Sequence, residues 1–337
     1  MTSHVPFLTP GRWSMLIRCF PRIHIGLLDM GAATPRKYGG AGFTLAGLPV
    51  ELEAVKSNKT SIAGLDKLDA SGQQDLLATI DRLQHRLPSA FARLTIRKLP
   101  PQHIGLGTKT ALLLGTIKAI SLVNGNRLQR TLVQRLAGRG GASGIGINSF
   151  FTGGFIIDAG HNNAQVPALE PSSSRRPAEI PPVICRAGIP GQWLIYLLQP
   201  QGRRYFGGAE REFFKRNTPI PATEILQAIA LIYHGVAPAV ITHNLPLLKS
   251  SIRQLQDTGF KRREVNAQPA VVKTLLNSFN EFPDCAVGLS SMGPLVYVIS
   301  DKRNEQTRLQ IERVCRNHKA ELLIACPGRN HGFEVMK

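Results

Sequence analysis

Two glycine-rich loops in the first half of the chain have the composition of sites that bind anions. Five glycines lie within nine residues in the segment GRGGASGIG, and the segment PPQHIGLGTKT lies upstream of it. Glycine lets the backbone adopt positive φ angles and lets a ligand approach the amide groups closely. A glycine loop before a helix attracts anions because free N–H groups and the helix dipole point outward there. The two loops therefore predict a substrate rich in phosphate.

The first loop runs from a predicted strand into a predicted helix. Its candidate phosphate-binding residues are Gly105, Gly107, Thr108 and Lys109. The loop lacks the Gly-Lys-Ser/Thr ending of a Walker P-loop, and a Gly-x-Gly pair alone is a weak signal. Because Lys109 stands at the helix start and a second glycine loop follows, an anion site is favoured. The alternative is a tight connection between a strand and a helix.

The second loop adds an arginine and a serine. Arginine can bind a phosphate through two parallel hydrogen bonds, and a serine hydroxyl can donate to a phosphate or lie near a metal. The alternative is that the glycines are needed only for close packing of the backbone, which applies best to Gly146 and to the Gly153-Gly154 pair. The candidate binding residues of this loop are Arg139, Gly140, Ser143, Gly144 and Asn148.

Two further segments hold polar side chains suited to a site. In PRIHIGLLDM, Arg22 and His24 would share one face of a strand because side chains alternate, and Asp29 follows near a turn. Taken by residue type alone, a core strand with a solvated arginine and a turn aspartate is slightly favoured. The second segment is a small-residue turn, LSSMGP, which matters only if it faces the glycine loops. Its candidate binding residues are Ser290, Ser291 and Gly293.

Composition limits the class of protein. Lys plus Arg number 41 against 22 Asp plus Glu, which gives a formal net charge of +19 over 337 residues. This balance suits an enzyme of anionic metabolites as well as a nucleic-acid-binding protein. The basic residues are dispersed and aromatic residues are few, so we predict no nucleic-acid partner.

The cysteines and the apolar segments indicate the compartment. The five cysteines are odd in number and widely spaced, which is typical of a reducing environment. We find no leader-like apolar core at the start and no uncharged apolar stretch long enough to span a bilayer. The chain is therefore predicted to be cytoplasmic, with no membrane partner. The C-x2-H-x7-C-x4-H spacing near the end is not predicted to bind zinc, because Cys315 and His318 fall in a helix and Cys326 ends a strand.

Hydrophobic periodicity predicts an α+β fold in two lobes, because strands and helices mix without regular βαβ alternation. A segment dense in proline and serine, 162–182, is expected to be an exposed linker that divides an N-terminal lobe, 1–182, from a C-terminal lobe, 183–337. Strands are predicted at 18–28, 42–55, 92–99, 154–158, 193–198, 286–289, 296–299 and 321–325. Helices are predicted at 72–86, 110–123, 126–137, 222–233, 245–255, 268–279 and 305–317.

Five segments taken in order resemble one enzyme family. They are PRIHIGLLDM, PPQHIGLGTKTALLLG, GRGGASGIGINSFFTGGFIIDAG, LQPQGRRYFGGAEREFF and LSSMGPLVYVI. The chain resembles the beta-ribofuranosylaminobenzene 5'-phosphate synthases, which have the GHMP kinase fold, from about residue 17 to the CPGRNHG segment. The resemblance implies a ribosomal-protein-like N-terminal lobe, a ferredoxin-like C-terminal lobe and a homodimer.

The resemblance also implies a reaction. The family joins phosphoribosyl pyrophosphate to 4-aminobenzoate with release of pyrophosphate and carbon dioxide, on the way to tetrahydromethanopterin. Glycine-loop amides, Lys109, Arg139 and Mg²⁺ would then stabilise the leaving pyrophosphate. Arg22 or His24 would hold the aromatic carboxylate, and Asp29 or Asp158 would hold the metal, with Asp29 also able to position the amine. Whether the acceptor is 4-aminobenzoate or 4-hydroxybenzoate stays open.

Three residues depart from the patterns of the families concerned. Lys109 stands where GHMP kinases have a small serine, which argues against the alternative function of an ATP-dependent small-molecule kinase. The synthase family usually has histidine in the segment of Asn148 and tryptophan at the position of Met292. These departures point to a divergent member of the synthase family with an altered substrate, or to a poorly active member.

Overall fold

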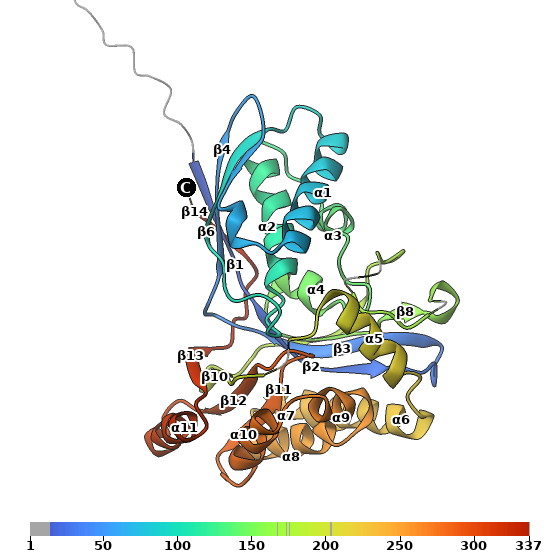
Figure 1. Ribbon diagram of the computed structural model, residues 1–337, viewed down its shortest axis with the longest axis vertical. Helices are drawn as coiled ribbons and strands as arrows, with labels where there is room; N and C mark the ends of the chain where they lie inside the picture. Colours follow the sequence, from blue (N-terminus) through green and yellow to red (C-terminus); the bar gives the residue numbers. More distant parts are fainter. Residues whose placement is uncertain (1–13, 167, 173, 175, 203, 337) are drawn as a thin grey trace, which may run out of the picture.

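The computed structural model describes residues 14–336 except 167, 173, 175 and 203. The described residues form three β-sheets with helices packed against them, so the predicted α+β architecture is confirmed (Figure 1). All strand pairs are antiparallel except β5 with β6.

The first sheet has the order β14-β1-β4-β6-β5 and carries α1, α2 and α3 on one side (Figure 1). Helix α2 is apolar around most of its circumference because it lies between this sheet and the other helices. Helix α1 begins where Asp69 accepts a hydrogen bond from the Gly72 N–H at 2.8 Å. The elements are β1 Ser14–Cys19, β4 Val50–Lys56, β5 Ser61–Ala63, β6 Ala92–Lys98, β14 Glu334–Met336, α1 Ala70–Arg86, α2 Thr108–Val123 and α3 Arg130–Ala137.

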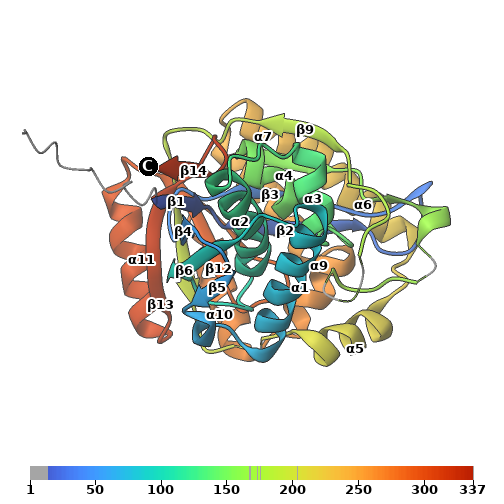
Figure 2. The same ribbon diagram turned by 90° about the horizontal axis from the view of Figure 1, so that it is seen from above.

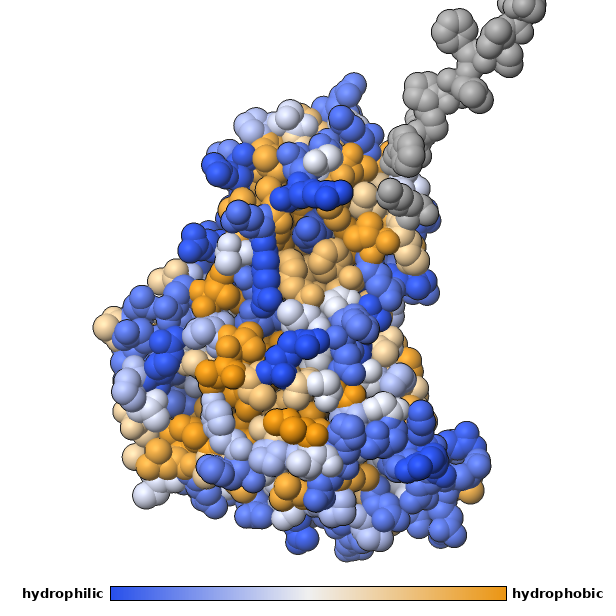
Figure 3. Space-filling model, turned by 180° about the vertical axis from the view of Figure 1, so that it is seen from behind, coloured by the Kyte–Doolittle hydropathy of each residue, from blue (hydrophilic) through white to orange (hydrophobic). Residues whose placement is uncertain are grey.

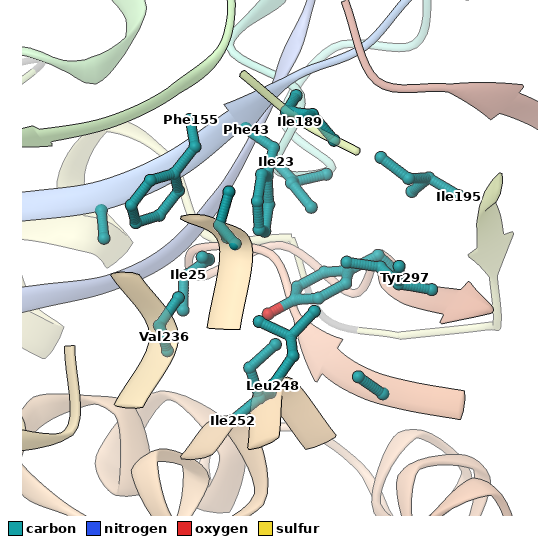
Figure 4. Close-up of a cluster of buried hydrophobic side chains, with 14 of the residues drawn as sticks. Ile23, Ile25, Phe43, Phe155, Ile189, Ile195, Val236, Leu248, Ile252 and Tyr297 are labelled. Atoms are coloured by element: carbon teal, nitrogen blue, oxygen red, sulfur yellow. The ribbon is translucent and has the colours of Figure 1, made fainter. Parts of the chain in front are cut away.

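The second sheet, β2-β3-β7-β9, crosses the middle of the molecule (Figures 1 and 2). Below it, Ile23, Phe43 and Phe155 meet side chains of the helices and of β12 in a buried cluster (Figure 4). The elements are β2 Arg22–Asp29, β3 Arg36–Thr44, β7 Phe155–Asp158 and β9 Val183–Ala187, with α4 Ile145–Thr152 beside them; β8 His161–Asn162 pairs with β3.

The third sheet, β11-β12-β10-β13, lies at the opposite end from α1 (Figure 1). Helices α10 and α11 bury apolar residues such as Val272, Phe279 and Ile311 against it. The elements are β10 Trp193–Gln199, β11 Cys285–Leu289, β12 Val296–Asp301, β13 Glu321–Pro327, α5 Gly207–Asn217, α6 Ala222–Leu231, α7 Ala237–Ile241, α8 Leu245–Gln256, α9 Gly259–Asn266, α10 Ala270–Asn280 and α11 Glu305–Asn317.

Two strands from the C-terminal part of the chain pair with strands of the N-terminal part. Strand β9 pairs with β7, and β14 pairs with β1. The division at residue 182 stays a prediction, and these pairings tie the two predicted lobes together. The surface seen in Figure 3 intersperses hydrophilic and apolar residues rather than showing one continuous apolar face.

Two predicted strands each turn out to be two strands in different sheets. The segment 18–28 divides at Pro21 into β1 and β2, because the chain leaves the first sheet there and enters the second. The segment 42–55 divides between β3 and β4 for the same reason. Gly47 and Pro49 lie between the two strands, and Glu51 and Glu53 alternate with apolar residues in β4.

Several helices differ from the sequence prediction. The helix predicted at 126–137 begins only at Arg130, and the one predicted at 222–233 continues through a π-turn, Ile232–Val236, into α7. Helices α4, α5 and α9 were not predicted. Their sequences contain glycine, aromatic or charged residues instead of a regular apolar stripe.

Among the described residues, one helical run is long and apolar enough to cross a membrane by length and composition, although it contains Glu224 and so is not an uncharged stretch. The 20-residue helical run Ala222–Ile241 passes that criterion. Ile232 and Val236 of this run lie in the buried cluster below β2. A core helix with one buried face meets the same criterion as a membrane span.

Candidate active site

Two adjoining cavities lie where β2, the two glycine loops and α5 meet. The inner cavity has a volume of about 130 Å³ and the outer cavity about 280 Å³. Both are bounded by Arg22, Thr110, Arg139, Glu210, Ser291 and Met292. Of the residues singled out in the sequence, the inner cavity also receives His24, Gly140 and Ser143, and the outer cavity Gly105, Gly107, Thr108, Lys109 and Gly293.

Strand β2 points Arg22 and His24 to the same side, as the alternation of side chains predicts. The Arg22 Nη1 donates to the Gly105 carbonyl at 2.6 Å, so the arginine lies beneath the first glycine loop. Its buried Nε has no hydrogen-bond partner among the described residues. Burial, followed by the nearby charge of Arg139, lowers the pKa of Arg22 to about 10, and Glu264 opposes this shift. Arg22 therefore remains a cation with a hydrogen available for a ligand.

His24 is a neutral imidazole at the inner cavity. Its side chain is buried, and neither ring nitrogen has a hydrogen-bond partner within the described part of the chain. Burial lowers its pKa well below the usual value, and the charges of Arg22 and Lys261 lower it further. Space for the ring comes from Gly40, where a Cβ would lie 2.8 Å from the His24 Nε2 and 3.0 Å from the Ser143 Oγ.

The first glycine loop delivers the N-terminus of α2 to the outer cavity. Gly107 is the N-cap residue with φ 70°, and no side chain caps the helix. The backbone N–H groups of the first turn are thus left for a ligand, as in known anion sites. Thr108 turns its hydroxyl away and donates to the Pro101 carbonyl at 3.1 Å, so the threonine contributes its backbone to this arrangement.

Ser290 holds three parts of the site together without lining either cavity. Its Oγ donates to the Gly105 carbonyl at 2.8 Å and accepts from the His24 N–H at 3.0 Å. The turn between β11 and β12 is thereby fixed to β2 and to the first glycine loop. Ser291 and Gly293, on the same turn, reach the cavities. The turn therefore faces the glycine loops, and only in that case did the sequence analysis expect it to contribute to the site.

The second glycine loop is held from behind by Asp158. This buried carboxylate accepts hydrogen bonds from the Ser143 Oγ at 3.0 Å and from the Gly144 N–H at 2.9 Å, and also from the Gly160 N–H. Burial raises its pKa to about 7. Because its acceptors point at the loop backbone, Asp158 positions Ser143 and does not line either cavity.

Asp29 also lies away from both cavities. Its carboxylate accepts from the N–H groups of residues 31–34 in the turn after β2, at 2.6–3.2 Å. These four bonds occupy the oxygens that the sequence analysis assigned to a metal or to the substrate amine. Asp29 shapes the β2–β3 turn.

Asn148 and Lys109 are engaged with protein groups. Asn148 is buried in α4 and accepts from the Arg130 Nη2 at 2.6 Å, while its Nδ2 donates to the Pro181 carbonyl. The Lys109 Nζ lies 3.0 Å from a carboxylate oxygen of Asp75 on α1, although the residue borders the outer cavity. Asn148 and Lys109, which both depart from the family patterns, therefore interact with side chains of neighbouring helices.

Comparison with known proteins settles the family. No family model matches the chain. It is 33% identical over 300 residues to beta-ribofuranosylphenol 5'-phosphate synthase of Methanocaldococcus jannaschii, covering 86% of this chain and 90% of that protein. The enzyme of the same name from Methanothermobacter thermautotrophicus is 30% identical over 329 residues, covering 96% and 99%. The chain belongs to the beta-ribofuranosylphenol 5'-phosphate synthase family.

Solved structures confirm the GHMP kinase-like fold. Homoserine kinase from Cytophaga hutchinsonii superimposes with a TM-score of 0.70 at 13% identity, covering 98% of this chain and all of that one. Mevalonate kinase from Methanococcus jannaschii gives 0.65 at 14% identity, covering 95% and 100%. At this identity the kinases establish the fold alone, whereas the synthase relatives establish an enzyme of the synthase family over the kinase alternative.

Sequence reasoning missed the acidic residues of this synthase-family site. Glu210, on the unpredicted helix α5, borders both cavities, and Glu264, on the unpredicted helix α9, borders the inner one. Glu264 is buried and forms an ion pair with Lys261 one helical turn away; burial nevertheless raises the pKa of Glu264. A usable signal was the Lys261–Glu264 spacing of three residues, which places opposite charges on one helix face.

The carboxylates at the cavities allow only a partial metal site. The described residues contain no group of three or more His, Cys, Asp or Glu side chains that could hold a metal ion. Mg²⁺ is usually bound by one or two carboxylates together with substrate phosphates, so a single carboxylate fits it. Glu210 borders both cavities, including the outer one at the start of α2, so it is the carboxylate that fits this role. Cys315, one of the residues of the zinc-like spacing, is a buried core residue, as expected.

Proposed function

We propose that this protein transfers the phosphoribosyl group of phosphoribosyl pyrophosphate to a 4-substituted benzoate, with release of pyrophosphate and carbon dioxide. The observation that carries the proposal is the junction of the two cavities. A helix N-terminus and glycine loop bound the outer one, and Arg22 borders both it and the inner one, which also contains His24 and the apolar side chains of Leu27 and Phe214. The names of the curated relatives, which specify a ribofuranosyl phosphate joined to a phenol, support it.

The outer cavity is suited to the diphosphate. The N–H groups at the start of α2 and the guanidinium of Arg139 would stabilise the negative charge that grows on the leaving group as the bond from ribose C1 to oxygen breaks. Mg²⁺, if bound by Glu210 and the phosphate oxygens, would supply further charge neutralisation. The cofactor and this ligand remain proposals.

The inner cavity is suited to the aromatic acid. Leu27, Phe214 and Met292 provide apolar contacts for a ring, and Arg22 can hold its carboxylate. The ring carbon that bears the carboxylate forms a bond to ribose C1 while the diphosphate departs with the bonding electrons. The bond to the carboxylate then breaks, carbon dioxide leaves, and its electron pair restores the aromatic ring.

The chemistry of His24 and the names of the relatives both bear on the 4-substituent. A neutral imidazole with no hydrogen-bond partner among the described residues can accept a hydrogen bond from a hydroxyl or an amine at the para position. The phenol in the relatives' names favours 4-hydroxybenzoate over the 4-aminobenzoate predicted from the sequence. We therefore place 4-hydroxybenzoate first and keep 4-aminobenzoate as the second acceptor.

The deciding experiment measures carbon dioxide released from carboxyl-labelled 4-hydroxybenzoate and 4-aminobenzoate. Each is incubated with Mg²⁺ and with or without phosphoribosyl pyrophosphate. We expect release that needs the phosphoribosyl donor and is lowered on the order of a hundredfold in Arg22→Gln, but not in Arg93→Gln, whose side chain is exposed on β6.

The absence of donor-dependent release from both acids by folded protein would contradict the proposal. Turnover of ATP in the same preparation would instead support the kinase alternative. A role in tetrahydromethanopterin synthesis, a homodimer and a cytoplasmic location accompany the proposal; sedimentation of the purified protein tests the dimer.

A further inference from the structure

A third cavity lies beside the proposed active site, on the other side of Arg139. Its volume is about 250 Å³, and three arginines border it: Arg82, Arg139 and Arg176. Ser172, Ser174 and Asp75 complete its polar lining. We call it the arginine cavity. Arg139 is its link to the site, since this residue borders the inner, outer and arginine cavities alike.

The three guanidinium groups are brought together at the end of α3. The Arg82 Nε donates to the Leu136 carbonyl at 2.8 Å, which fixes the arginine to the last turn of that helix. Arg176 lies over Gly138, because a Cβ added to this glycine would be 3.5 Å from the Arg176 Nε. Arg139 follows Gly138 directly in the chain. The three arginines therefore meet at the C-terminal end of α3. Arg139 follows this helix, Arg82 comes from α1, and Arg176 comes from a later loop.

The arginine cavity gathers three cations, and the carboxylates of Asp75 and Glu210 favour the charged state of Arg139. Burial and then the charge of Arg176 lower the pKa of Arg82, whereas Asp75 and Asp81 raise it. Asp75 is the acidic residue of the cavity lining, and it also forms an ion pair with Lys109 at 3.0 Å. Like charges held together in this way repel unless an anion lies between them.

Arg139 provides a second, independent indication of a ligand. Its Nε is buried yet has no hydrogen-bond partner among the residues that the structure describes. A buried donor without a partner costs roughly 1–3 kcal/mol, so such groups usually mark a missing ligand or water. Guanidinium forks and serine hydroxyls together match the three oxygens of a terminal phosphate.

We propose that the arginine cavity binds a phosphate monoester, and that in turnover this is the 5'-phosphate of the phosphoribosyl donor. The assignment rests on the proposed function. It gives the donor two separate anchors, the diphosphate at the start of α2 and the monoester at the arginine cavity, with Arg139 between them. The ribose C1 is then held over the inner cavity from both ends.

The test uses ribose 5-phosphate and inorganic pyrophosphate as probes in calorimetric titrations. Arg176→Gln removes an exposed arginine, and Arg82→Gln removes the anchored one. Arg86→Gln is the matched control, because Arg86 lies one turn further along α1, is exposed and does not line the cavity. We expect both cavity variants to weaken ribose 5-phosphate on the order of tenfold, which corresponds to about 1.4 kcal/mol, and to leave pyrophosphate unchanged.

Three outcomes separate this assignment from the proposed function. Unchanged ribose 5-phosphate binding in both cavity variants would overturn the assignment, whether or not carbon dioxide is released. Weakened pyrophosphate binding with unchanged ribose 5-phosphate would overturn it too, because the cavity would then hold the diphosphate. Weakened ribose 5-phosphate binding in protein that releases no carbon dioxide would support the cavity and contradict the transferase. Arg176→Gln keeps the test valid if Arg82→Gln fails to fold.

Discussion

At the scale of single residues, the site is distinguished by a histidine that the fold keeps uncharged. His24 lies between Arg22 and Lys261, and its two ring nitrogens have no partner among the described residues. A protonated imidazole there would meet two cations, while Glu264 at the same cavity is paired with Lys261 and Asp29 on the same strand is bonded to the turn after β2. The arrangement favours a group that accepts a proton from substrate over one that binds an anion.

The neutral state of His24 predicts how stability depends on pH. The unfolded chain binds a proton at this residue near pH 6.5, while the folded chain does not, so acidification favours the unfolded state. Wild type should lose up to about 1.4 kcal/mol per pH unit below pH 6.5 relative to His24→Gln. Urea unfolding at pH 7.5 and 5.5 measures this difference, with the exposed His85→Gln as control. An equal difference at both pH values would show that His24 takes up its proton in the folded protein as readily as in the unfolded chain.

At the scale of elements, short turns and loops determine where the functional side chains lie. Asp29 is the clearest case, since its carboxylate organises the turn between β2 and β3 through four backbone N–H groups. The resemblance to the synthase family implied a chemical role for the same residue, whereas residue type alone slightly favoured a turn aspartate. The structure assigns it to the turn.

Asp29→Asn should therefore affect stability more than chemistry. The amide replaces an acceptor by a donor that faces a backbone N–H, and we expect a loss of roughly 1–3 kcal/mol in the free energy of unfolding. The activity of the folded fraction should stay within a few fold of wild type. Denaturant unfolding and activity assays on the same samples decide, with the exposed Asp66→Asn as control. Loss of activity at unchanged stability would show instead that Asp29 takes part in the reaction.

The first glycine loop makes a second prediction at this scale. Gly105 has φ 110°, and a Cβ there would lie 2.3 Å from the Ser290 carbonyl oxygen. Gly105→Ala should therefore displace the loop from the β11–β12 turn and raise the dissociation constant for pyrophosphate at least tenfold, since strain of this kind costs about 1–3 kcal/mol. Gly191→Ala is the control because nothing lies within 4 Å of its Cβ position. Equal binding by the two variants would mean that the loop does not form the anion site.

Sequence patterns found the glycine loops, β2 and the serine turn, because each has a local composition that does not depend on distant residues. They failed for elements whose position depends on packing against distant parts of the chain. Helices α5 and α9 lack a regular apolar stripe, so Glu210 and Glu264 could not be placed at the site. The proline- and serine-rich segment expected to be a linker instead supplies Ser172 to the cavities, held partly by the hydrogen bond from the Ala142 N–H to the Ser172 Oγ. Its composition indicates exposure but not where it folds back.

At the scale of the whole molecule, the net charge of +19 should speed the capture of an anionic donor. Salt screens such long-range attraction, since the Debye length falls from about 10 Å at 0.1 M to about 3 Å at 1 M. We expect kcat/KM for phosphoribosyl pyrophosphate to fall on the order of tenfold between low and high salt, with kcat little changed. Steady-state kinetics at constant free Mg²⁺ measures this. A kcat/KM independent of salt would assign donor capture to short-range contacts alone.

The pairing of β1 with β14 has a consequence for synthesis of the protein on the ribosome. Leu16 pairs with Met336, so a strand near the start of the chain completes its sheet with one translated more than three hundred residues later. At about 5–20 residues per second, β1 keeps one edge open for tens of seconds. An open edge is a template for wrong pairing, so nascent chains halted before residue 334 should need chaperone protection that the finished chain does not.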